Sequence, residues 1–119
     1  RYLKKMPSYK LHYEKSSEPI AGFVDADWAG DSTDGKSFTG YTFMAAKCVF
    51  SWQSQKQNVV ALSSTEAEYI GLSTAAKEAE YLRKPLYEMG FEIIGPMIIN
   101  CDNQEAQPHE KFVKELGIY

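Results

Sequence analysis

Three stretches in the first half of the chain have the pattern of β-strands. Ile20 to Asp25 is a short apolar run that ends in a carboxylate, as in a buried strand. Ser37 to Ala45 is rich in Thr, Phe and Tyr, and Cys48 to Ser54 alternates polar and apolar residues, so both are predicted strands. Because only Ala46 and Lys47 separate these two, we expect an antiparallel meander.

The clearest predicted element is a helix over residues 65–89, where apolar residues recur at helical spacing among Ala, Glu, Leu and Lys. Ser63 and Glu66 have the spacing of a capping box at its start. Pro85 should kink or divide this helix, and Gly90 should end it.

A fourth strand is predicted at residues 97–101, directly before Asp102. Its continuous apolar run is typical of a strand buried on both faces. Because a helix separates it from the meander, the fold class is α/β with a mixed sheet.

The first nineteen residues have a different character. Residues 1–6 are predicted to be the end of a helix that stops at Pro7, and residues 9–14 alternate as a short strand. Residues 15–19 form a polar turn. We therefore divide the chain into a connecting segment, 1–19, and a domain, 20–119.

Composition and charge narrow the function classes. Hydrophobic residues make up 44% of the chain, enough for a core, and no apolar run reaches the ~20 residues that span a bilayer. Cys48 and Cys101 lack metal-ligand spacing, and reduced thiols suit an intracellular protein. The net charge of −3 argues against a free-standing nucleic-acid binder, unless a larger protein supplies the affinity.

Three acids stand where elements begin or end: Asp25, Glu68 and Asp102. If the first and fourth strands are parallel neighbours, Asp25 and Asp102 share a sheet edge that the helix can bring Glu68 to. Carboxylates gathered there would repel one another unless a hard cation such as Mg²⁺ bound them. The alternative is that each is an ordinary turn, cap or helix-dipole residue.

A phosphate-loop pattern, G-x-x-x-x-G-K-S, occurs at residues 30–37. That motif requires a helix directly after it, whereas the residues that follow are strand-like. We interpret the segment as a hairpin loop.

Several blocks, in order, resemble the ribonuclease H domain of copia-type retrotransposon Pol polyproteins. The strongest are Asp25-Ala26-Asp27-Trp28-Ala29-Gly30-Asp31 and Ala61-Leu62-Ser63-Ser64-Thr65-Glu66-Ala67-Glu68-Tyr69. The others are Thr39-Gly40-Tyr41, Ser51-Trp52, Lys56-Gln57 and Asp102-Asn103-Gln104. Arg1-Tyr2-Leu3-Lys4 is similar to the end of the preceding reverse-transcriptase connection.

The resemblance implies a ribonuclease H-like fold in which Asp25, Glu68 and Asp102 are catalytic ligands of two Mg²⁺ ions, with Mn²⁺ as a substitute. Ser64, Thr65 and Gln104 match positions that contact an RNA–DNA hybrid, although plain capping or surface roles remain open for them. The implied activity is hydrolysis of the RNA strand during reverse transcription. The implied partners are the hybrid and the reverse-transcriptase domain, with no membrane, in the cytoplasm or nucleus.

The sequence departs from the family after Gln104. The family continues with a helix, a fifth strand and a last helix that brings a fourth acid, and that motif is absent here. We expect the fifth strand to be missing. Glu110 or Glu115 could replace the fourth acid, but no motif supports either. His109 could be a proton shuttle or an ordinary surface residue. The alternative function is therefore an inactive, truncated remnant that serves as a structural or interaction module.

Overall fold

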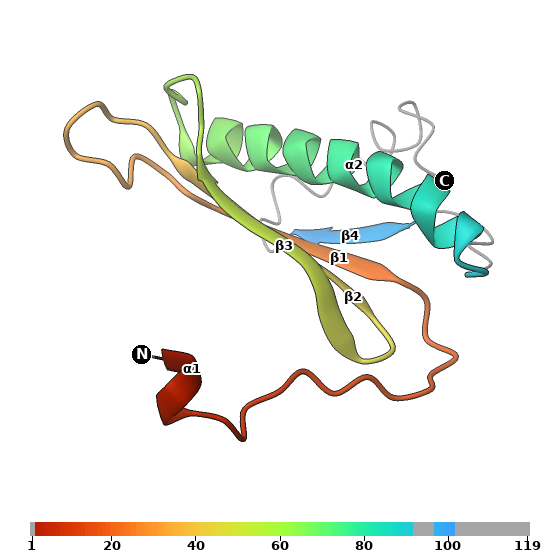
Figure 1. The fold of residues 1–119 in the computed structure, drawn as a ribbon. Helices are drawn as coiled ribbons and strands as arrows, with labels where there is room; N and C mark the ends of the chain where they lie inside the picture. The colour runs from red at the N-terminus through yellow and green to blue at the C-terminus, as the bar shows by residue number, and fades with distance from the viewer. Residues whose placement is uncertain (1, 92–96, 102–119) are drawn as a thin grey trace.

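The computed structural model describes residues 2–91 and 97–101 (Figure 1). These residues form two helices and four strands. In order they are α1 (Tyr2–Lys5), β1 (Ala21–Asp27), β2 (Phe38–Ala45), β3 (Cys48–Lys56), α2 (Ser64–Glu88) and β4 (Ile98–Cys101). Among these residues no helix combines the length and apolar character needed to cross a membrane.

The four strands form one mixed sheet in the order β3-β2-β1-β4. β1 pairs antiparallel with β2, and β2 pairs antiparallel with β3, which confirms the predicted meander. Ala46 and Lys47 connect β2 to β3 with φ angles of 51° and 61°, the left-handed geometry of a tight two-residue hairpin turn. β4 pairs parallel with β1, so the predicted neighbourhood of the first and fourth strands is confirmed.

α2 begins where the capping signal predicts. The Ser63 side chain accepts a hydrogen bond from the Glu66 backbone N–H at 3.1 Å. The Glu66 carboxylate in turn accepts from the backbone N–H of Leu62 at 2.6 Å, one residue before the cap. Pro85 does not divide the helix, because it lies in the last turn, and Gly90 follows the helix end with φ of 88°.

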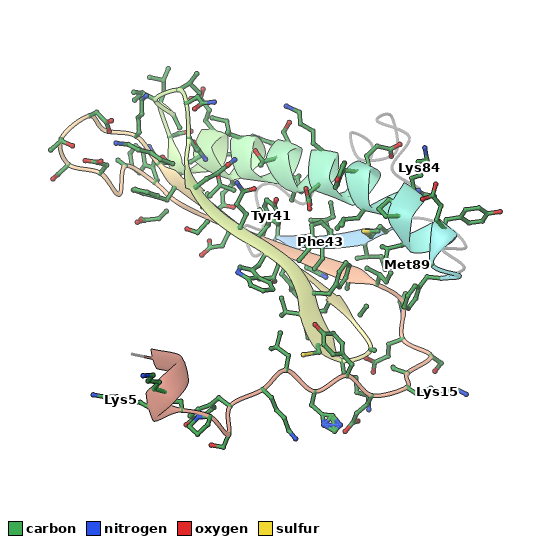
Figure 2. The ribbon with its side chains drawn as sticks, viewed as in Figure 1. Lys5, Lys15, Tyr41, Phe43, Lys84 and Met89 are labelled. Carbon is green, nitrogen blue, oxygen red and sulfur yellow. The ribbon has the colours of Figure 1, made fainter. Side chains whose placement is uncertain are left out.

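α2 covers one face of the sheet, and the core lies between them (Figure 1). Figure 2 shows Tyr41 and Phe43 in this layer, where their rings meet edge to face with centroids 5.8 Å apart. Ala75 and Ala79 of α2 are fully buried against it. Small helix residues let the backbone of α2 approach the sheet closely, and Gly71 packs against Val24 and Thr39.

Among the described residues the opposite face of the sheet is largely open. This corrects two predictions: that the first strand is buried, and that the fourth is buried on both faces. Phe23 of β1 is 45% exposed and Ile98 of β4 is 54% exposed. Apolar side chains on alternate positions therefore face water on this side. A continuous apolar run cannot reveal this, because it gives no sign of which face is covered.

The prediction of a strand at residues 9–14 is wrong. This segment runs past the β2–β3 turn on the side of the sheet away from α2 (Figure 1). It makes one backbone hydrogen bond there, from Glu14 N–H to Ala46 O at 3.1 Å, and the Tyr13 hydroxyl donates to Val49 O at 2.7 Å. Alternating side chains alone do not make a strand without a partner for its backbone groups. The helical end predicted at residues 1–6 is present as α1.

Candidate functional site at the β1–β4 edge

Asp25 lies inside β1 rather than at its end, because the strand continues to Asp27. The last pairing between β1 and β4 is Val24 with Cys101. Asp25 is therefore the first β1 residue beyond the described part of β4. The prediction that Asp25 closes the first strand is therefore wrong, because β1 ends two residues later.

Strand alternation places Asp25 on the open face. Val24 is buried beneath α2, and successive side chains of a strand point to opposite faces. Asp25 is exposed and lines a shallow hollow of about 400 Å³ together with Phe23, Thr42 and Trp52. A carboxylate on an exposed edge of mainly apolar surface is accessible to a solvated ligand.

Glu68 lies in the second turn of α2 and is only 7% exposed. The thiol of Cys101 lies 3.4 Å from its carboxylate and donates to Oε2. This contact brings the Glu68 carboxylate to the end of β4, beside the point where its described pairing with β1 ends. Burial of a glutamate destabilises the folded state unless its oxygens have hydrogen-bond partners. The Cys101 thiol is one such partner at this edge.

Asp102 and Gln104 lie outside the described residues, as do His109, Glu110 and Glu115. The prediction about the fifth strand concerns the same segment and stays a prediction. Within the described ranges no three His, Cys, Asp or Glu side chains form a metal-sized group. The predicted trio includes Asp102, so it stays a prediction. Glu68 contacts Cys101, and Asp25 follows Val24, the strand partner of Cys101. Both residues carry carboxylate oxygens, the type of ligand that suits Mg²⁺.

The two candidate nucleic-acid contacts in the described region, Ser64 and Thr65, form the first turn of α2. Ser64 is exposed and Thr65 is partly buried. Both lie one turn before Glu68, at the same end of the helix. Asp27 is exposed at the end of β1.

A loop between β1 and β2 borders this edge, and ion pairs hold its shape. Lys56 Nζ lies 2.6 Å from Oδ2 of both Asp31 and Asp34. Hydrogen bonds from the Lys56 ammonium lower the pKa of both carboxyls, and Thr33 adds to the effect at Asp31. β2 follows the loop directly, so the structural context of a phosphate loop is absent, as predicted.

Sequence reasoning missed the hydrogen bonds of two further side chains, Trp28 after β1 and Gln57 after β3. The indole N–H of Trp28 donates to Ala61 O at 3.1 Å, just before the helix. The buried amide of Gln57 donates to Thr39 Oγ1 at 2.8 Å and to Ala67 O at 2.9 Å. The only sequence signal was the presence of Lys56-Gln57 in a family-like block, which carries no sign of which partner the amide finds.

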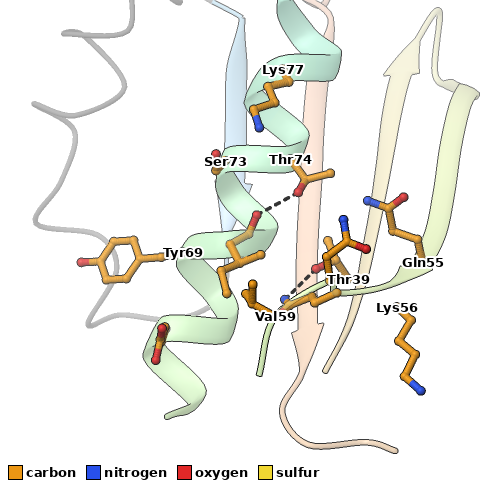
Figure 3. Close-up of a pocket in the computed structure, with 12 residues that line it drawn as sticks. Thr39, Gln55, Lys56, Val59, Tyr69, Ser73, Thr74 and Lys77 are labelled. Carbon is orange, nitrogen blue, oxygen red and sulfur yellow. Dashed lines mark hydrogen bonds between the residues drawn. The ribbon is translucent and has the colours of Figure 1, made fainter. Parts of the chain in front are cut away.

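Gln57 borders a hollow of about 390 Å³ between α2 and the end of β3 (Figure 3). Ser73, Thr74 and Lys77 line it from the helix, and Gln55 and Lys56 line it from the strand. Figure 3 shows the hydrogen bond that ends on Thr39 at the floor of this hollow. Two positive side chains, Lys56 and Lys77, line its walls. Lys56 is already paired with two aspartates.

Comparison with known proteins gives similarity to part of much longer chains. The chain is 41% identical over 106 residues to the retrovirus-related Pol polyprotein from transposon TNT 1-94 of Nicotiana tabacum. It is 36% identical over 107 residues to the Pol polyprotein from transposon RE2 of Arabidopsis thaliana. Each alignment covers 89% of this chain but only 8% or 7% of the polyprotein.

A shorter relative is also similar. The secreted RxLR effector protein 161 of Plasmopara viticola is 45% identical over 83 residues, which cover 69% of this chain and 58% of that protein. No family model matches this chain, and no solved structure matches it. The longest alignments therefore relate this chain to one segment of plant retrotransposon Pol polyproteins.

Proposed function

We propose that this chain is the ribonuclease H-type segment of a retrotransposon Pol polyprotein, and that it hydrolyses the RNA strand of RNA–DNA hybrids by two-metal-ion catalysis. Similarity to Pol polyproteins over 89% of the chain supports the retrotransposon part of this proposal. The order and spacing of the acid-bearing motifs support the ribonuclease H part.

The contact between Glu68 and Cys101 is the observation that carries the proposal. The Cys101 thiol is 3.4 Å from Glu68 Oε2, and Cys101 pairs with Val24, the residue before Asp25. Asp102 follows Cys101 directly in the sequence. These positions support the proposal that the three acids, 77 positions apart from first to last (102 − 25), act together at one corner of the sheet.

The chemistry follows from the donor set. Oxygen ligands favour hard divalent cations, so Asp25, Glu68 and Asp102 would hold Mg²⁺, with Mn²⁺ as a substitute. Bound Mg²⁺ supplies an activated water and charge stabilisation at the scissile phosphate. The protein residues act as ligands: exposed Asp25 reaches the solvent side, and Glu68 approaches from the helix side.

The substrate and partners follow from shape and charge. A hybrid is recognised through its groove shape and 2′-hydroxyls rather than its base sequence. Ser64, Thr65 and Gln104 are proposed to contact it. With a net charge of −3, the chain has little electrostatic affinity for phosphates, so we propose that the reverse-transcriptase part of the same polyprotein supplies it. The proposed setting is intracellular, in a cytoplasmic particle or the nucleus.

Cleavage of a hybrid with a labelled RNA strand tests the proposal. The 119-residue chain should cut the RNA in Mg²⁺ and not in EDTA. Asp25→Asn, Glu68→Gln and Asp102→Asn should each lower the rate by at least about 100-fold, as expected when a metal ligand is lost.

Two neighbouring acids provide matched controls. Glu66→Gln and Asp27→Asn remove equal charge close to the site, and Glu66 is already used at the helix cap. Their cleavage rates should stay within about threefold of wild type. Equal rates for Asp102→Asn and wild type would remove the mechanism. A chain that binds no Mg²⁺ and cuts no hybrid would favour the inactive remnant.

A further inference from the structure

Gln57 is a buried polar residue that the proposed chemistry does not use. It is 5% exposed and lies between the end of β3 and the start of α2. Its side-chain N–H₂ group donates to Thr39 Oγ1 and to Ala67 O, at 2.8 and 2.9 Å. Its side-chain oxygen is also buried, and no hydrogen-bond partner for it exists within the described part of the chain.

The unpaired oxygen makes a purely stabilising role a poor explanation for this residue. Burying a carbonyl without a partner destabilises the folded state. Ala67 O lies inside a helix, where a backbone donor one turn later satisfies it in any case. An apolar side chain of the same size would fill the space without leaving an orphan acceptor.

The two acceptors of the Gln57 amide lie next to the two acid-bearing elements. Ala67 is the residue before Glu68 in α2. Thr39 of β2 pairs with Ala26, which is the residue after Asp25 in β1. The amide therefore connects the backbone of Ala67, one residue before Glu68, to the side chain of Thr39, whose strand partner is one residue after Asp25.

From this geometry we infer that Gln57 is a positioning residue, which sets the rotation and height of α2 so that the Glu68 carboxylate stays at the end of β4, beside the strand that carries Asp25. The inference rests on the proposed function, because it assigns Gln57 a role through those two ligands. Trp28 joins the loop after β1 to Ala61, before α2, but it is half exposed and makes no contact inside the helix through this bond.

Magnesium titration followed by thermal melting tests this inference without relying on activity. A site formed in the native state raises Tm as the ion binds. Gln57→Met keeps the side-chain volume but removes both donors and the orphan acceptor. The Mg²⁺ concentration at half-maximal Tm increase should rise about 10-fold or more, while the metal-free Tm should fall by no more than about 3 °C.

Gln55→Met is the matched control. Gln55 lies two residues earlier in β3, and its side chain accepts from Gln53 rather than bonding to α2. This variant should titrate like wild type. If Gln57→Met also titrates like wild type, or if its metal-free Tm falls as much as that of a core truncation, the positioning role is wrong.

A double-mutant cycle shows whether Gln57 acts through Glu68. In a Glu68→Gln background, Gln57→Met should change the magnesium midpoint by less than about twofold, because the ligand it positions is already lost. An equal shift in both backgrounds would overturn the inference.

The two proposals fail in different ways. Magnesium binding without hybrid cleavage by the wild-type chain would overturn the nuclease function, and the titrations would still decide the role of Gln57. Hybrid cleavage with an unaltered Gln57→Met midpoint would overturn only the positioning role. A wild-type chain with no magnesium response would overturn both.

Discussion

The two faces of the sheet are built from the same strands but do different work. On the face beneath α2, Val24, Tyr41 and Phe43 are buried in a continuous core. On the other face, Phe23 is half exposed and Trp52 is 63% exposed, and Asp25 lies among them. The difference teaches that stability is concentrated on one side, which leaves the other side free to carry solvent-accessible chemistry. Glu68 departs from this division of the two faces, because it is an acidic residue on the covered side.

Truncation of one phenylalanine on each face should give the largest contrast. Phe43 is fully buried and Phe23 is not. Phe43→Ala should lower the free energy of unfolding by about 3–5 kcal/mol through lost burial and an unfilled cavity. Phe23→Ala should lower it by no more than about 1 kcal/mol. Urea denaturation of both variants measures the difference, and equal losses would mean that the open face is covered in solution.

Two glycines on opposite faces give a smaller contrast of the same kind. A Cβ on Gly22 would lie 2.7 Å from Cε1 of Phe43, so the buried ring would have to move. Gly22→Ala should therefore cost about 1–3 kcal/mol. The nearest atom to a Cβ on Gly40 is Gln53 O at 4.0 Å, and Gly40→Ala should change stability by less than about 1 kcal/mol. A reversed order in denaturant melts would contradict the assignment of faces.

Removal of the Lys56 ion pairs should give the smallest effect and a characteristic pH dependence. Lys56 lowers the pKa of Asp31 and Asp34 in the folded state. Such carboxyls add stability above their unfolded pKa of about 4, and this is lost as pH falls through the lower folded pKa. Lys56→Met should therefore lower Tm at pH 7, and the gap from wild type should shrink progressively below about pH 4. A gap that is constant with pH would mean that Lys56 acts through packing alone.

Local chemistry made much of the fold predictable. The capping pair of Ser63 and Glu66, the short Ala46-Lys47 turn and the helix-ending Gly90 each act within a few residues, and each appears where the pattern indicates. The parallel partnership of the first and fourth strands was a conditional expectation, and the pairing of Val24 with Cys101 confirms it.

Properties that depend on distant partners were not predictable. Whether a strand is covered depends on where α2 lies, so Phe23 and Ile98 were wrongly expected to be buried. The alternating segment at residues 9–14 lacked a partner strand, which its own residues cannot reveal. The bonds of Gln57 to Thr39 and Ala67 join residues 18 and 10 positions apart. Of the three proposed ligands, the described structure brings Glu68 to the edge next to Asp25's strand, and Asp102 stays a prediction.

A crystal structure of the chain grown with Mn²⁺, whose anomalous scattering locates the ion, tests the central claim most directly. The account predicts an ion at the β1–β4 edge with carboxylate oxygens of Asp25, Glu68 and Asp102 at about 2.1 Å, the distance Mg²⁺ also requires. It is contradicted if no ion binds at this edge, or if an ion binds there without carboxylate oxygens from all three residues.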